Sequence, residues 1–73
     1  MDRYFFNTGT ITKASSGRDI LRKIGINATA KSAKGISPTM GCGFGIVVGR
    51  KDAERARRTL KQHGIGILAE TDF

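Results

Sequence analysis

The residues best suited to chemistry are Gly41-Cys42-Gly43, which contain the only cysteine of the chain. Glycine neighbours leave the sulfur unshielded, and they allow backbone N–H groups to turn toward it. A concave set of N–H groups stabilises an anion, and the thiolate is the nucleophilic form of cysteine. The pattern therefore predicts a reactive sulfur at Cys42. The alternative is a small buried apolar residue in a tight turn.

Nucleic-acid binding is a second kind of chemistry that this region suggests. The stretch Cys42-Gly43-Phe44-Gly45-Ile46-Val47-Val48-Gly49 partly matches the third strand of RNA-recognition motifs, which carries aromatic residues that stack on bases. It lacks the first basic residue and two of the three aromatic positions. In this interpretation Phe44 and Phe5 would stack on bases, with Arg3 among the basic residues that contact phosphates. The alternative is that Phe44 belongs to the core face of a strand.

The chain is basic, with 13 Lys and Arg residues against 6 Asp and Glu residues and a net charge of +7. A positive charge of this size suits an acidic or polyanionic partner. Basic residues are dense after residue 49, where they would form a docking surface for an acidic protein: Arg50, Lys51, Arg55 and Arg58. The alternative is an ordinary solvated helix face.

Several classes of site are excluded by what the sequence lacks. One cysteine and one histidine, His63, cannot supply a four-ligand zinc site. No Ser-His-Asp spacing, paired loop acids or HExxH motif is present, and His63 suits the C-terminal end of a helix. We therefore expect no metal and no organic cofactor. An acylphosphatase-like enzyme is a distant alternative, because no suitable Arg and Asn pair can be located.

The elements that must position Cys42 follow from hydrophobic periodicity and turn residues. Thr10 or Thr12 would cap the first helix, Gly17 weakens its centre and Gly25 ends it. Asp52 would cap the second. The expected order is strand 3–7, helix 11–24, strand 26–31, loop 32–43, strand 44–49, helix 50–63 and strand 65–70. This β-α-β-β-α-β order predicts an α+β, ferredoxin-like domain over residues 1–73, with a four-stranded antiparallel sheet and two helices on one face.

The chain has 73 residues and no long apolar run. Such a chain has room for one small core, and it lacks the stretch of about 20 apolar residues that a membrane span requires. The N-terminal residues do not form a signal peptide. With one cysteine and no internal disulfide, we expect a cytoplasmic protein with no membrane partner. Exposed sheet edges would allow a homodimer.

In the order of its elements and in the segment Met40-Gly41-Cys42-Gly43-Phe44-Gly45-Ile46, the chain resembles the short bacterial domains of the selenium/sulfur carrier protein-like family. The aromatic stretch Tyr4-Phe5-Phe6 and the helix end Leu21-Arg22-Lys23-Ile24-Gly25-Ile26 extend the resemblance over nearly the whole chain. The family's Pro-x-Pro-Arg segment is absent, and the only proline, Pro38, lies nearer the cysteine. Thr39 stands where members have serine.

The resemblance implies that Cys42 accepts sulfur or selenium as a persulfide-type adduct and passes it to an acceptor protein. The donor would be a protein such as a cysteine desulfurase. Gly41, Gly43, Thr39 and Pro38 would support the loop, and the basic helix would assist docking. Such a carrier needs no cofactor and is not an enzyme in its own right. A partner-binding regulatory domain with a structural Cys42 is a further alternative.

Overall fold

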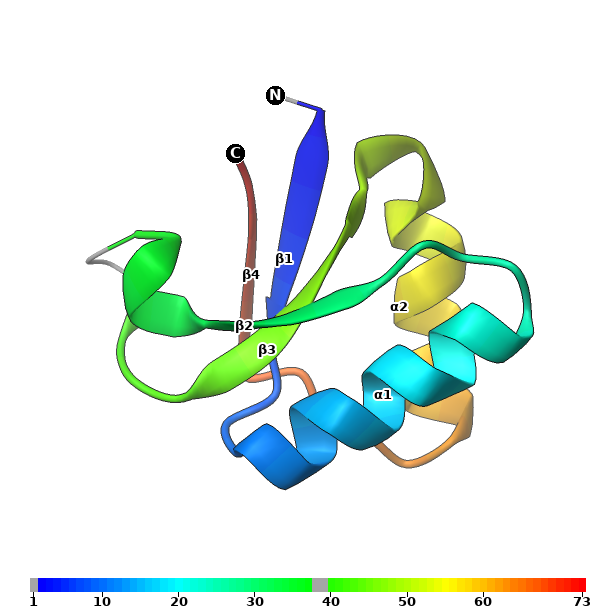
Figure 1. Ribbon diagram of the computed structural model, residues 1–73, viewed down its shortest axis with the longest axis horizontal. Coiled ribbons are helices and arrows are strands. Elements are labelled where there is room, and N and C mark those ends of the chain that lie inside the picture. Colours follow the sequence, from blue (N-terminus) through cyan, green and yellow to red (C-terminus); the bar gives the residue numbers. More distant parts are fainter. Residues whose placement is uncertain (1, 38–39) are drawn as a thin grey trace.

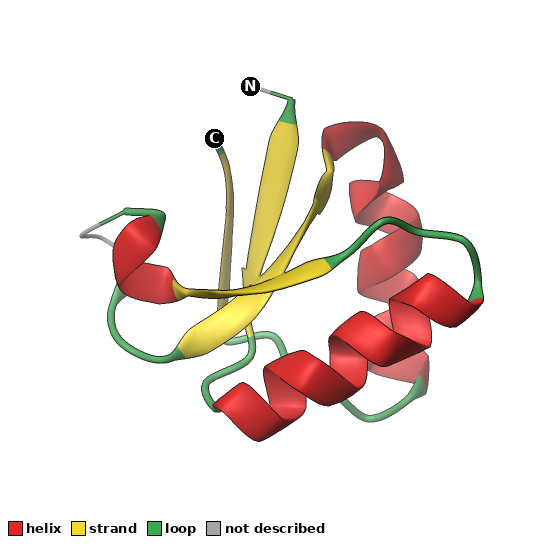
Figure 2. Ribbon diagram, viewed as in Figure 1, coloured by secondary structure: helices red, strands yellow, loops and turns green. Residues whose placement is uncertain are grey.

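The structure, a computed structural model, describes residues 2–37 and 40–73, in which four strands form one sheet covered by two helices (Figures 1 and 2). The strand order is β2-β3-β1-β4, and all neighbouring strands are antiparallel. The predicted ferredoxin-like α+β fold is confirmed. The elements are β1 (Arg3–Asn7), α1 (Ile11–Lys23), β2 (Thr29–Ser32), the 3-10 helix η1 (Ala33–Gly35), β3 (Phe44–Gly49), the 3-10 helix η3 (Arg50–Asp52), α2 (Ala53–Gln62) and β4 (Ala69–Asp72).

The register of the sheet decides which side chains face the helices. Phe6 of β1 lies opposite Ile46 of β3, and Phe5 lies opposite Val47. Because successive strand residues point to opposite faces, Phe6 and Ile46 face the helices. We call the other side of the sheet the open face. By the same alternation it carries Arg3, Phe5, Asn7, Thr29, Lys31, Gly45, Val47 and Gly49.

The core lies between the sheet and the helices, and α1 approaches closely because of Gly17. The core includes Phe6, Leu21, Ile46 and Leu60, all fully buried. A Cβ atom on Gly17 would lie only 2.5 Å from Ile46 Cδ1 and 2.9 Å from Leu60 Cδ2. Gly17, which weakens the centre of the helix, therefore allows α1 to pack closely against β3 and α2.

The ends of α1 match the prediction, and the start of α2 does not fully match it. The Lys13 N–H donates to Thr10 Oγ1 at 3.1 Å, so Thr10 caps α1. Gly25 takes a positive φ of 86° directly after the helix. Asp52 precedes α2, but its side chain makes no capping hydrogen bond. Its φ and ψ of −98° and 0° are those of the preceding η3 turn rather than of an extended cap.

Strands β2 and β4 begin later than predicted. Ile26 and Ile65 are buried, as their alternating patterns indicate, but they lie in irregular segments. Pairing starts only at Thr29, opposite Val47, and at Ala69, opposite Asn7. The alternation of apolar and polar residues predicts which side chains are buried. It does not predict where backbone pairing begins, because a side chain can be buried in an unpaired segment.

Candidate functional site

Cys42 is exposed in the segment that connects η1 to β3. Its neighbours Gly41 and Gly43 have φ angles of 78° and 106°, which residues with side chains rarely adopt. A Cβ atom on Gly43 would lie 2.5 Å from the Gly9 carbonyl oxygen, whereas one on Gly41 would have nothing within 4 Å. Both glycines are therefore needed for the backbone path, and only Gly43 is packed against the rest of the fold.

Asn7, at the end of β1, holds the backbone around Cys42. Its Nδ2 atom donates to the carbonyl oxygens of Met40, at 3.1 Å, and of Cys42, at 3.3 Å. Its Oδ1 atom accepts from the Gly9 N–H at 2.9 Å. The side chain is only 3% exposed, so its polar atoms depend on these partners. Nothing in the sequence pointed to Asn7, because an asparagine before a turn is common.

The residues after Cys42 are held by further hydrogen bonds. The Ala33 N–H donates to the Gly43 carbonyl at 2.9 Å. The Phe44 carbonyl accepts from the Thr8 and Gly9 N–H groups, at 3.0 and 3.1 Å, and from Thr8 Oγ1 at 3.1 Å. We call residues 40–43 the cysteine loop. Its backbone is fixed before, at and after Cys42, while the thiol itself remains exposed.

The expected cluster of N–H groups around the sulfur is not found. Within residues 2–37 and 40–73, no donor makes a hydrogen bond to Cys42 Sγ. The bonds that hold this region are accepted by the carbonyl oxygens of Met40, Cys42 and Gly43, from Asn7 and Ala33. The predicted supporting residues Pro38 and Thr39 lie outside the described residues.

The basic residues proposed for docking lie away from Cys42. Arg50 and Lys51 follow the last residue of β3, whereas Cys42 precedes its first residue, Phe44. A six-residue strand spans about 17 Å, which exceeds the screening length of about 8 Å at physiological salt. Arg50 pairs with Asp72 at 3.5 Å. These charges are therefore not part of the cysteine site.

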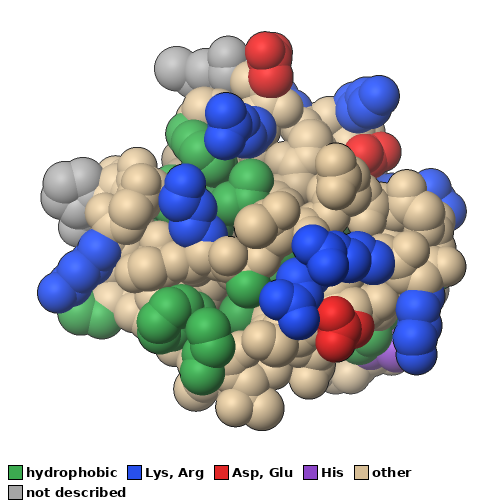
Figure 3. Space-filling view, viewed as in Figure 1, with side chains coloured by type: hydrophobic (Ala, Val, Ile, Leu, Met, Phe, Trp, Pro, Cys, Tyr) green, Lys and Arg blue, Asp and Glu red, His purple; other side chains and the backbone are tan. Residues whose placement is uncertain are grey.

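Two other basic residues proposed for docking belong to α2. Arg55 donates from Nη2 to the Ile24 carbonyl at 3.1 Å, and this bond ties α2 to the end of α1. Arg58 is exposed. Figure 3 shows Lys and Arg side chains spread widely over the visible face, with few acidic side chains between them. The positive charge is thus distributed over the surface rather than concentrated beside the thiol.

The three residues proposed for nucleic-acid contact are not brought together. Phe5 is 0% exposed, and its ring lies against Gly45 on the open face. Phe44 is 37% exposed, but alternation assigns it to the face of Ile46. Arg3 is exposed on the open face, with its guanidinium 5.7 Å from the centre of the Phe73 ring. A buried Phe5 has no free ring face on which a base could stack.

A polar cluster that the sequence did not suggest joins α2 to the sheet. Arg57 donates to Glu70 from both Nη2, at 2.6 Å, and Nε, at 3.0 Å, and the Tyr4 hydroxyl donates to Glu70 at 2.7 Å. The bonds from Arg57 lower the pKa of Glu70. The bond to Glu70 raises the pKa of Tyr4. Arg57 also lies over the Tyr4 ring, at 5.8 Å, so the cluster is a structural link.

No cation site accompanies these groups within the described residues, where no three His, Cys, Asp or Glu side chains gather to hold a metal. The His63 ring places Nδ1 2.9 Å from the Thr59 carbonyl oxygen at the end of α2.

In the described part of the chain, no helix is both long enough and apolar enough to cross a membrane.

Comparison of the chain with family models, curated proteins and solved structures gives no match.

Proposed function

We propose that this protein is a small carrier of sulfur, or of selenium, that accepts the atom on Cys42 and delivers it to a partner. One observation carries the proposal: the Cys42 thiol is exposed, while Asn7 fixes the backbone that bears it. A carrier must present the same atom to two proteins in turn. An exposed side chain on a fixed loop meets that requirement, since little conformational freedom is lost when a partner binds.

The loading step transfers one sulfur atom without a net change in oxidation state. The Cys42 thiolate attacks the outer sulfur of a donor persulfide, R–S–SH. A bond forms between Cys42 Sγ and that sulfur while the donor S–S bond breaks, and the donor leaves as a thiolate. The proton of the Cys42 thiol passes to solvent. An acceptor nucleophile then attacks the outer sulfur and releases Cys42 as a thiolate.

The resemblance to the selenium/sulfur carrier protein-like domains supports this choice over other uses of a cysteine. It suggests a cysteine desulfurase as the donor. Because Arg50 and Lys51 are separated from the thiol by the length of β3, we propose that the donor is recognised mainly through the cysteine loop and the adjoining start of β3. Arg50 and Lys51, in η3, would contribute long-range attraction rather than contacts at the sulfur.

The test is intact-mass spectrometry after incubation with a cysteine desulfurase and cysteine, beside Cys42→Ser and an unchanged sample without the enzyme. We expect a gain of one sulfur atom that reductant removes and that Cys42→Ser lacks. Alkylation of the folded protein measures thiol access separately. No adduct on a protein whose Cys42 alkylates readily would reject the transfer role. A thiol that resists alkylation until the chain is unfolded would favour the structural alternative.

Nucleic-acid binding by Phe5 and Phe44 has less support. Stacking on aromatic rings provides much of the affinity of single-stranded nucleic-acid modules, and Phe5 is fully buried. Salt-sensitive retention of an RNA oligonucleotide that is lost in Phe44→Ala would favour this alternative over the carrier.

A further inference from the structure

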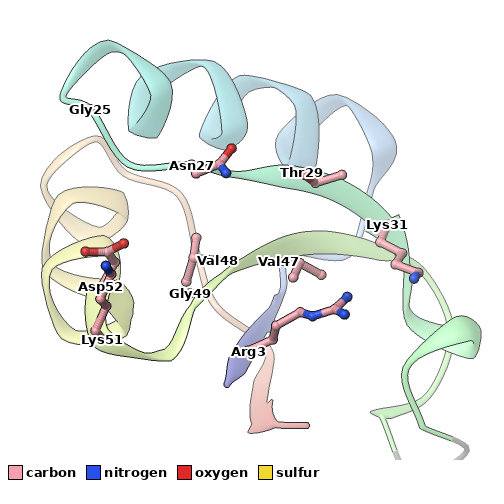
Figure 4. Close-up of a pocket in the computed structure, with 10 residues that line it drawn as sticks. All are labelled: Arg3, Gly25, Asn27, Thr29, Lys31, Val47, Val48, Gly49, Lys51 and Asp52. Atoms are coloured by element: carbon pink, nitrogen blue, oxygen red, sulfur yellow. The ribbon is translucent and has the colours of Figure 1, made fainter. Parts of the chain in front are cut away.

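The open face of the sheet contains a cavity of about 550 Å³ near the end of β3 (Figure 4). It is lined by Val47 and Gly49 of β3, by Arg3 of β1 and by Lys31 of β2, among others. Gly49 contributes no side chain, so the surface is hollowed between the two neighbouring strands. A volume of this size is within the range of small-molecule sites, about 300–1,000 Å³. Cys42 does not line it.

The charged groups around the cavity are predominantly positive. Arg3, Lys31 and Lys51 line it with one carboxylate, Asp52. All three cations are exposed, and none forms an ion pair within the described residues. Elsewhere Arg18, Arg50 and Arg57 each have an acidic partner, whereas other surface cations, such as Lys13 and Arg58, likewise form no ion pair within the described residues. The cavity therefore has three unpaired cations and one carboxylate along its lining.

Arg3 and Lys31 lie at one end of the cavity, and Lys51 lies at the other end beside Asp52 (Figure 4). Figure 4 shows the charged ends of Arg3 and Lys31 on the same side of Val47, while Asn27 and Asp52 lie toward the other end. The Asp52 carboxylate lies close to Gly49, 3.7 Å from the position of a Cβ atom there. An anionic group would therefore be placed near Arg3 and Lys31. Hydroxyl or amine groups would suit the end formed by Asn27 and Asp52.

We infer that this cavity binds a small phosphate monoester with a polar, hydroxyl-bearing remainder, of the size of a nucleoside monophosphate. The phosphate would accept hydrogen bonds from Arg3 and Lys31, because Arg and Lys form short charge-assisted bonds with phosphate oxygens. Sugar hydroxyls would donate to Asp52 and accept from Asn27. This binding is separate from the proposed sulfur transfer and does not depend on it.

A single phosphorylated small molecule fits this surface better than a nucleic-acid strand does. Among the described residues, no aromatic side chain lines the cavity, and Phe5 beneath the open face is buried. A strand bound on a sheet would need exposed rings for successive bases.

The test is a titration of the full-length ¹⁵N-labelled protein with adenosine 5′-monophosphate, followed by NMR, at low salt. We expect shifts confined to the amides around the cavity, including those of Gly25, Asn27, Thr29 and Gly49. Arg3→Gln and Lys31→Gln should each weaken binding by about five- to tenfold, because each removes a bond to a charged group. Lys61→Gln, which removes the same charge from α2 outside the cavity, should leave the affinity within about twofold.

Four outcomes separate the possibilities. Localised shifts with the stated variant pattern would support the site, and Cys42→Ser should bind equally well. No localised shifts would reject it. Equal weakening by Lys61→Gln would show general attraction to a basic protein, which also rejects a built site. Much tighter binding of a single-stranded RNA oligomer, with shifts across the open face, would replace the small ligand with nucleic acid.

Discussion

Asn7 and Cys42 are joined by a hydrogen bond of 3.3 Å between the Asn7 side-chain amide and the Cys42 carbonyl, across 35 positions of the sequence. The same amide also reaches Met40. Because Asn7 ends the central strand β1, the position of the exposed thiol is set by the sheet rather than by the loop alone.

Replacing this anchor should loosen the cysteine loop. Asn7→Ala removes the side-chain donor to the Met40 and Cys42 carbonyls and one of the two acceptors of the Gly9 N–H, and we expect a loss of about 1–3 kcal/mol of unfolding free energy. Chemical denaturation measures it, and amide hydrogen exchange at Phe44, whose N–H donates to the Gly9 carbonyl, should accelerate. Asn27→Ala is the matched control, because Asn27 is exposed and lies outside the loop. Equal stability of the two variants would contradict the anchoring role.

The two glycines beside Cys42 should differ in their tolerance of a side chain. Gly41→Ala encounters only the strain of a positive φ, worth about 1–2 kcal/mol. Gly43→Ala adds a collision with the Gly9 carbonyl and should cost more. Thermal unfolding ranks the two variants, and the rate of Cys42 alkylation shows whether the thiol remains presented. A Gly43→Ala protein as stable as Gly41→Ala would show that the loop is not packed as described.

Gly45 should be among the least replaceable residues. A Cβ atom there would meet the Phe6 carbonyl oxygen and the Phe5 ring, and overpacking of this kind costs about 1–3 kcal/mol or more. We expect Gly45→Ala to unfold at a markedly lower temperature or to fail to fold. Gly66→Ala, with nothing near the added atom, should change stability by less than about 0.5 kcal/mol. Similar melting temperatures would contradict this assignment of Phe5 to the open face.

The Arg57–Glu70 pair should make the free energy of unfolding depend on pH. Because the folded-state pKa of Glu70 is lowered, its stabilising contribution is present above its ordinary value of 4.5 and is lost as the pH falls through the lower folded value. The unfolding free energy of the unchanged protein should exceed that of Glu70→Gln by about 0.5–1 kcal/mol near neutral pH, and the difference should shrink below pH 4.5. Denaturation across this range measures it. Glu54→Gln, an exposed acid on α2, should show no such convergence.

Local patterns were enough to predict the helices and the core face of β3. Thr10 and Gly25 mark the ends of α1, because capping and positive φ are properties of single residues. Alternation along residues 44–49 assigned Ile46 to the core face, as the alternative to base stacking, and Ile46 is fully buried. Gly17 was interpreted as a weak helix position, because the neighbours that require it, Ile46 and Leu60, are distant in the sequence.

The candidate site was predictable only in part. The cysteine between two glycines predicted either a reactive sulfur or a small buried residue in a tight turn, and the structure shows Cys42 exposed between two glycines of positive φ. Its anchor, Asn7, is a long-range contact that a local pattern does not contain. The burial of Phe5 also escaped prediction, because Gly45 gives it space only after β1 and β3 pair.

The burial of Phe5 on the open face has a kinetic consequence. In β1, Phe5, Phe6 and Asn7 are all buried and lie between two neighbouring strands. Partial opening events proceed from elements with few buried contacts, so β1 should be among the last segments to open, after the edge strands β2 and β4. The cysteine loop is thus tied through Asn7 to the slowest-exchanging part of the molecule, and Cys42 should react from the native state at a rate that fluctuations of the sheet edges do not control.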